Sequence, residues 1–194
     1  MIKGLPSNLR AAMASRTLVR IERCCEDGWV DGYVVALAKQ WFVLHVVGEG
    51  ITFVGYQAFR VKDVTSHVAP APYAAFKEKA LRMRKLRRTV PAKLDLSSTA
   101  ALLLSANAKF PLVTVHCELV DPEVCHIGQV IEVSRTAVKL CEIDPDATWD
   151  SELTSHRLTK ITRIDFGGPY EEALALVGGR ANLAFKRVAL KRVP

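Results

Sequence analysis

The sequence predicts a mainly β protein with some α-helix. It comprises two tandem copies of a helix followed by a small five-stranded β-barrel, related by internal duplication and joined by a basic helical segment. Three observations predict this. The two halves share a pattern, β-branched and aromatic runs alternate with polar turns, and basic residues crowd into the middle of the chain. With 49% of its 194 residues apolar and 24% charged, the chain has enough apolar surface to fold nearly throughout.

The internal repeat consists of four blocks that recur in the same order. The matched blocks are residues 18–21 with 112–115, 32–37 with 128–133, 60–65 with 157–162, and 72–73 with 169–170. Their offset is 94, then 96, then 97, and it changes only where a turn or loop is expected. Chance does not readily produce four ordered matches of this kind, so the repeat predicts two copies of one fold.

Each copy is predicted to begin with a short helix, residues 7–15 and residues 98–108, with a serine available as N-cap. Five strands follow in each copy, because β-branched and aromatic residues recur between polar turns. In the first copy they are residues 17–24, 29–37, 41–47, 51–59 and 60–66; in the second, residues 112–119, 125–133, 137–143, 151–157 and 158–164. Gly32 and Gly128 lie inside the second strands and predict strong bends that would let the strands close.

A helix is predicted after each barrel. Residues 73–88 form the first, with an apolar face that we expect to be buried and a basic face that we expect to be exposed. The apolar face consists of Tyr73, Phe76, Ala80 and Met83. Residues 170–177 form the second helix, which Gly178-Gly179 would end. The predicted divisions are barrel 1–68, basic helical linker 69–96, barrel with C-terminal helix 97–180, and basic tail 181–194.

The predicted pattern of a helix and five bent strands, with Gly32 or Gly128 in the second strand, resembles the Sm-like fold of LSm and Hfq proteins, an SH3-like small barrel. The resemblance covers about residues 7–66 and 98–164. Sm-like proteins form rings through their fourth and fifth strands and bind RNA, so the resemblance implies RNA and self-association. The tandem arrangement also resembles uncharacterised bacterial proteins. The family's third-strand aspartate and asparagine have no counterpart here, so its base-binding pocket is not implied.

Basic residues concentrate in residues 77–93, which contain eight basic residues and one acidic residue. The net charge of this segment, +7, equals that of the whole chain. So dense a run lacks acidic partners one helical turn away and points to a polyanion. We therefore predict a non-enzymatic module that binds RNA weakly and with little sequence preference. The predicted nucleic-acid-binding residues are Lys77, Lys79, Arg82, Arg84, Lys85, Arg87, Arg88 and Lys93. The alternative is a protein-interaction or regulatory module that assembles through exposed strand edges.

Aromatic residues offer stacking platforms for bases, or filling for a small core, and the second use is the commoner one. The candidates are Trp29, Tyr33, Trp41, Phe53 and Tyr56. No motif of an enzyme or a nucleotide loop occurs, so we predict neither catalysis nor a cofactor.

Two groups of residues that contain cysteine raise other possibilities: Cys117 with His126, and Cys24 with Cys25. If a hairpin turns at Asp121-Pro122, Cys117 and His126 would lie opposite each other, but they supply two ligands where a structural zinc needs four. Packing is therefore the favoured interpretation, and whether Cys117 and His126 form part of a metal site stays open. Cys24-Cys25 would point to opposite faces of a strand, which favours packing over thiol chemistry.

The five cysteines, an odd number without a CxxC pair, favour reduced thiols over a disulfide framework. No apolar run is long enough to span a membrane, and the first ten residues do not read as a secretory signal. We therefore expect a cytoplasmic protein without a membrane partner.

Overall fold

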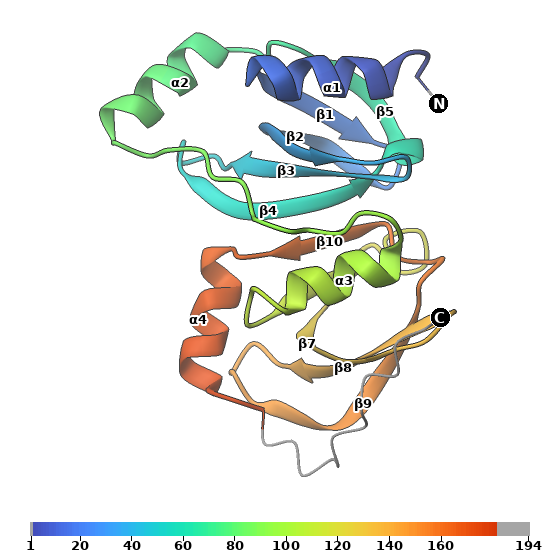
Figure 1. The fold of residues 1–194 in the computed structure, drawn as a ribbon. Helices are drawn as coiled ribbons and strands as arrows, with labels where there is room; N and C mark the ends of the chain where they lie inside the picture. The colour runs from blue at the N-terminus through green and yellow to red at the C-terminus, as the bar shows by residue number, and fades with distance from the viewer. Residues whose placement is uncertain (1, 182–194) are drawn as a thin grey trace. The chain divides into compact units, whose positions relative to one another are not determined.

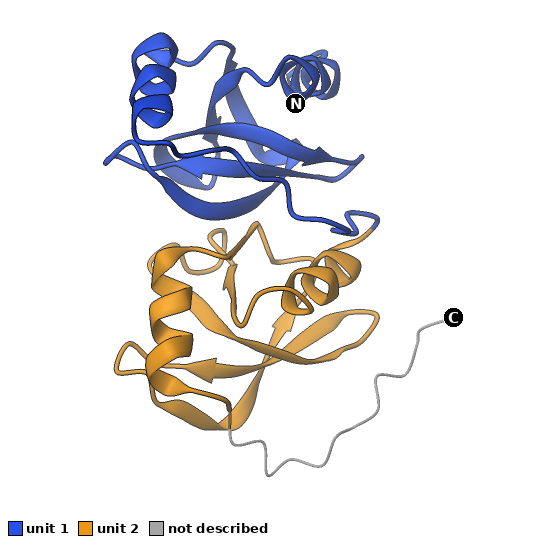
Figure 2. Cartoon of the chain, turned by 60° about the vertical axis from the view of Figure 1, so that its left-hand side comes forward, with its two compact units in different colours: residues 1–97 blue, residues 98–194 orange. Residues whose placement is uncertain are grey.

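The computed structural model describes residues 2–181 and divides the chain into two compact units, residues 1–97 and residues 98–194 (Figure 2). The basic segment 69–96 belongs to the first unit. The predicted basic tail, apart from residue 181, lies outside the described residues. None of the described helices is long and apolar enough to cross a membrane.

The first unit is an antiparallel sheet with two helices, α1 and α2 (Figure 1), which pack into two separate hydrophobic clusters. Its elements are α1 (Leu5–Ser15), β1 (Leu18–Arg23), β2 (Glu26–Leu37), β3 (Trp41–Val47), β4 (Phe53–Arg60), the 3-10 turn η1 (Val61–Asp63), β5 (Val64–Val68) and α2 (Ala74–Met83). The strands run in the order β5-β1-β2-β3-β4. Leu5, Leu9 and Ala12 of α1 pack into one core, while Ala74 and Leu81 of α2 join a second core.

The second unit has the same order of elements. They are α3 (Thr99–Asn107), β6 (Val113–His116), β7 (Cys125–Val133), β8 (Ala137–Ile143), β9 (Trp149–Arg157), β10 (Arg163–Phe166) and α4 (Pro169–Gly178). Its strands run in the order β10-β6-β7-β8-β9. Leu102, Leu103 and Ala106 of α3 are fully buried, and Leu174 of α4 packs with Leu112 and Ile143. The Ser98 hydroxyl accepts a hydrogen bond from the Ala101 amide and caps α3, as expected.

The prediction of two tandem five-stranded barrels is wrong. Within each unit, the five described strands form an antiparallel sheet that is not closed into a barrel. Closure of each group of five would require β5 to pair with β4 and β10 to pair with β9. Among the described pairings, β5 instead bonds β1 and β10 bonds β6. These strands are short, Val64–Val68 and Arg163–Phe166, and offer few hydrogen bonds for a further pairing.

The strand register of the first unit recurs in the second. Gly32 pairs with Val19 and Val46, and Gly128 pairs with Val113 and Glu142. In both units the strand register is irregular beginning two residues after the glycine, between Val34 and Ala36 and between Val130 and Glu132. A Cβ on Gly128 would lie 2.2 Å from the Cys141 carbonyl oxygen, so only glycine permits this close approach of β7 to β8.

The prediction for the basic helix is wrong in its end and in its buried face. Helix α2 ends at Met83, because Lys85 adopts a left-handed conformation (φ 58°) and the Leu86 amide bonds back to the Leu81 carbonyl. Leu81 is 4% exposed, whereas Phe76 is 63% and Met83 is 74% exposed. The face of α2 that contacts the sheet therefore carries Ala74, Lys77 and Leu81, and the predicted apolar face points to solvent.

Candidate functional site

A pocket of about 340 Å³ opens in the first unit beside α2 and the residues that follow it. Four cations line it: Arg82, Lys85, Arg87 and Arg88. Tyr33, Phe53, Leu81 and Leu86 add aromatic and aliphatic surface, and Glu78 is the one acidic residue of the lining. The pocket therefore joins a strongly positive wall to an apolar floor, a composition suited to a phosphate with an attached ring.

The chain that carries these cations is held in place at both ends. At its start, Leu81 of α2 packs against the sheet, and the turn that follows α2 holds Lys85 in the left-handed conformation. Beyond Arg88, the Thr89 amide donates a hydrogen bond of 3.2 Å to His45 Nδ1, and the hydroxyls of Thr89 and Tyr56 bond to each other. The sheet thus fixes the backbone that presents Arg87 and Arg88.

Neutral side chains surround the cations. Burial, together with the Glu78 charge, raises the pKa of Tyr33 to about 12, so its phenol stays protonated. Burial, followed by the charge of Arg88, lowers the pKa of His45 to about 4, so its imidazole is neutral at pH 7. The charge of the pocket therefore comes from four cations and Glu78.

The structure separates the eight predicted binding residues. Arg82, Lys85, Arg87 and Arg88 line the pocket, while Lys79 and Lys93 are exposed and lie outside its lining. Lys77 is instead bonded to Asp31, a buried side chain on β2. Arg84 donates to the carbonyl oxygens of Gly50 and Ile51. Lys77 and Arg84 thus stabilise the fold rather than face the pocket.

Two of the five candidate aromatic residues, Tyr33 and Phe53, line the pocket, whereas Trp41 is fully buried. Phe53 stacks on His45 with ring centroids 3.9 Å apart, and His45 stacks on Tyr56 at 4.6 Å. This row of three rings forms a rigid platform beneath the basic segment.

A second cluster lies in the second unit, where His126, Glu142 and His156 meet. Their ligand atoms all lie within 4.8 Å of one another. Glu142 bonds His126 Nδ1 at 3.0 Å and His156 Nε2 at 2.9 Å. Burial would raise the pKa of Glu142, but the bonds from His156, Thr154 and His126 outweigh it and hold that pKa at about 2.

Cys117 neighbours His156, although its sulfur is not among the ligand atoms that lie within 4.8 Å of one another. Burial would lower the pKa of His156, yet hydrogen bonds with Cys117 and Glu142 raise it to about 9. The predicted pairing of Cys117 opposite His126 is off by two residues, because Val115 pairs with His126. Cys117 follows two residues after Val115 and so lies on the same face. The sequence prediction missed Glu142 and His156, although both replace apolar residues of the first copy.

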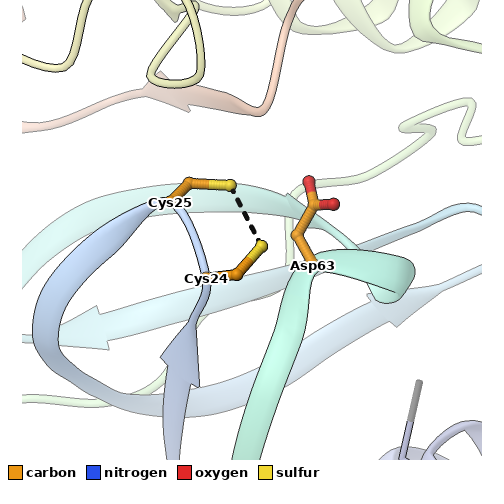
Figure 3. Close-up of side chains that lie close together, drawn as sticks. All are labelled: Cys24, Cys25 and Asp63. Carbon is orange, nitrogen blue, oxygen red and sulfur yellow. Dashed lines mark hydrogen bonds between the residues drawn. The ribbon is translucent and has the colours of Figure 1, made fainter.

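A third cluster joins Cys24, Cys25 and Asp63 in the first unit (Figure 3). The two cysteines lie in the turn between β1 and β2, so the prediction that they point to opposite faces of a strand is wrong. Their sulfur atoms are 3.5 Å apart, and Asp63 stands beside them on η1. Burial and the neighbouring Cys24 raise the pKa of Cys25 to about 12, so this thiol is a poor nucleophile.

Comparisons with protein-family models, curated proteins and solved structures gave no match to this chain. The Sm-like resemblance therefore rests on the sequence pattern alone, and the geometry of the sites carries the functional argument.

Proposed function

We propose that this protein is a non-enzymatic module that binds single-stranded RNA weakly and with little sequence preference, at the pocket beside α2. The observation that carries the proposal is the convergence of Arg82, Lys85, Arg87 and Arg88 on a pocket that also holds Tyr33 and Phe53. Arginine binds phosphate through paired N–H donors, and an aromatic surface accepts any base. Contacts of both kinds position a strand without reading its sequence.

The backbone at Lys85 has a conformation that is uncommon for a residue with a side chain, and Arg16 takes the same conformation after α1. A side chain in the left-handed region costs of order 1 kcal/mol, and glycine is the usual residue at this position after a helix. Lys85 occupies it with φ 58° and lines the pocket.

The distribution of charge supports the same location. Residues 1–97 contain sixteen basic and eight acidic residues, a net charge of +8. Residues 98–194 contain eleven basic and twelve acidic residues, a net charge of −1. A polyanion is therefore attracted to the first unit. The free cysteines of the described chain support the cytoplasmic setting that this function needs.

The test is the salt dependence of RNA binding. Each phosphate contact on a single strand contributes about −0.7 to the slope of log affinity against log salt. Changing Arg82, Lys85, Arg87 and Arg88 together to glutamine should therefore flatten the slope by roughly 2.8 and weaken binding to all sequences alike. Fluorescence anisotropy with labelled poly(U) and with a mixed-sequence strand, from about 50 to 200 mM salt, measures both effects.

The matched control removes four exposed cations of the same unit that do not line the pocket: Lys3, Arg10, Lys39 and Lys62, each to glutamine. It loses the same charge and should keep most of the affinity and slope. Equal losses of RNA affinity in the two quadruple variants would show that RNA is held by general electrostatic attraction and not by the pocket. A pocket variant that binds RNA as the wild type does would refute the proposed site.

A protein-interaction module is the second candidate function, and the exposed apolar side of α2 favours it. Tyr73, Phe76 and Met83 are 80%, 63% and 74% exposed. Strand β9 also ends the sheet with β8 as its one neighbour in the described strand order, so its edge can accept another strand. Binding that is insensitive to salt, with no RNA affinity at about 50 mM salt, would place this candidate first.

A further inference from the structure

We propose that the second unit holds one divalent transition-metal ion, zinc by its ligand chemistry, between His126, Glu142 and His156, with Cys117, a neighbour of His156, moving in as the fourth ligand. The inference is independent of RNA binding, since it concerns other residues in the other unit. Two imidazoles, a carboxylate and a thiolate are a set that zinc takes in tetrahedral sites.

The sheet brings these side chains together from separate strands. His126 lies on β7, Glu142 on β8 and His156 on β9, while Cys117 directly follows β6. The register places Glu142 opposite Gly128, two residues from His126, and therefore on the same face. Three adjacent strands and the end of a fourth thus supply one ligand each.

Three of the proposed ligands already lie close together, with their ligand atoms within 4.8 Å of one another. Ligands about 2.0–2.1 Å from a tetrahedral zinc lie roughly 3.3 Å from one another. The Glu142 oxygens now lie 3.0 Å from His126 Nδ1 and 2.9 Å from His156 Nε2. The two bonds use different oxygens of Glu142, Oε2 towards His126 and Oε1 towards His156, and an ion between the three side chains would replace these hydrogen bonds with metal bonds. Thr154 also bonds Glu142, as an orienting partner of a metal ligand does.

The fold itself does not require a polar cluster at this place. By strand register, His126, Glu142 and His156 correspond to Val30, Val46 and Phe59 of the first unit. Val46 and Phe59 belong to that unit's hydrophobic core, and Val30 packs against it. A β-sheet of this kind is therefore built with apolar residues at all three positions. The polar side chains of the second unit, partly withdrawn from water, point to a ligand.

The experiment uses the full chain, stripped with a chelator and titrated with Zn²⁺ and Co²⁺. One ion per chain is expected, with the visible absorption of tetrahedral cobalt and a thiolate-to-cobalt charge-transfer band. Glu142→Gln and His156→Gln should each weaken zinc binding at least ~100-fold, because loss of a direct ligand exceeds loss of an outer partner. Cys117→Ser should remove the charge-transfer band.

Matched controls distinguish this site from the other thiols. Cys125→Ser changes a neighbour of His126 that points to the opposite face, and Cys24→Ser with Cys25→Ser changes the first unit's cluster. These variants should bind zinc as the wild type does. Loss of binding in the Cys24 and Cys25 variant, or no stoichiometric binding by the wild type, would overturn the proposal.

One measurement needs no variant and so survives any folding defect. Zinc should protect Cys117 from alkylation by iodoacetamide and leave Cys125 reactive, as mapped by mass spectrometry. Equal alkylation of Cys117 with and without zinc would remove it from the ligand set.

Discussion

The protonation state of His45 affects how the basic segment is held beside the pocket. It is 5% exposed, it stacks between Phe53 and Tyr56, and its Nδ1 accepts the Thr89 amide that anchors the basic segment. The acceptor role fixes the neutral tautomer with its proton on Nε2. A proton added to Nδ1 would break that anchor and place a charge near Arg88.

The protein should therefore lose stability in acid through His45. Its pKa is about 4 in the folded protein and ordinarily about 6.5, so the unfolded chain binds the proton first and stability falls from pH 6.5 towards pH 4. Urea unfolding at pH 7 and pH 5 should show wild type losing about 1–2 kcal/mol more than His45→Asn, which keeps an acceptor but does not titrate. Equal losses in both proteins would assign the acid sensitivity to other groups.

At the scale of the element, α2 shows where sequence patterns reach their limit. The strands were predictable, and residues 41–47, 125–133 and 137–143 match β3, β7 and β8 from end to end. The buried face of α2 was not, because a distant residue decides it. Asp31, placed on β2 and already bonded to Arg20, takes Lys77 as a partner and turns that face inward. No local period carries that information.

Lys77 should thus contribute to the stability of the fold and not to RNA binding. Burial would raise the pKa of Asp31, but Arg20 and Lys77 keep it below its usual value, so the carboxylate is charged and needs both partners. Lys77→Gln should lower the unfolding free energy by about 1–2 kcal/mol and leave RNA affinity unchanged. Lys79→Gln, on the exposed side of the same helix, should change stability by less than ~0.5 kcal/mol. Unchanged stability together with weaker RNA binding in Lys77→Gln would contradict this assignment.

At the scale of the whole molecule, the number of strands and their order along the chain could be predicted from the sequence. Whether the first and last strands of each group pair to close a barrel could not. Short β5 and β10 carry strand-like residues, and residue type says nothing about a second pairing partner. The same limit applies to the sites. The basic run marked Arg82, Lys85, Arg87 and Arg88, whereas Glu142 and His156 join Cys117 and His126 only through strand register. Side chains that meet across strands need the register before they can be grouped.

Photocrosslinking of the intact chain to single-stranded RNA should map to the first unit. The net charge of +8 in residues 1–97 and of −1 in residues 98–194 biases encounter, and the rings of Tyr33 and Phe53 line the same pocket as the four cations. Among the described residues, crosslinked peptides should therefore contain Tyr33, Phe53 or residues 82–88. Adding salt should reduce their yield together, because one set of phosphate contacts holds the strand. Crosslinks concentrated in residues 98–179, or a yield that salt does not change, would show that the basic pocket is not where RNA binds.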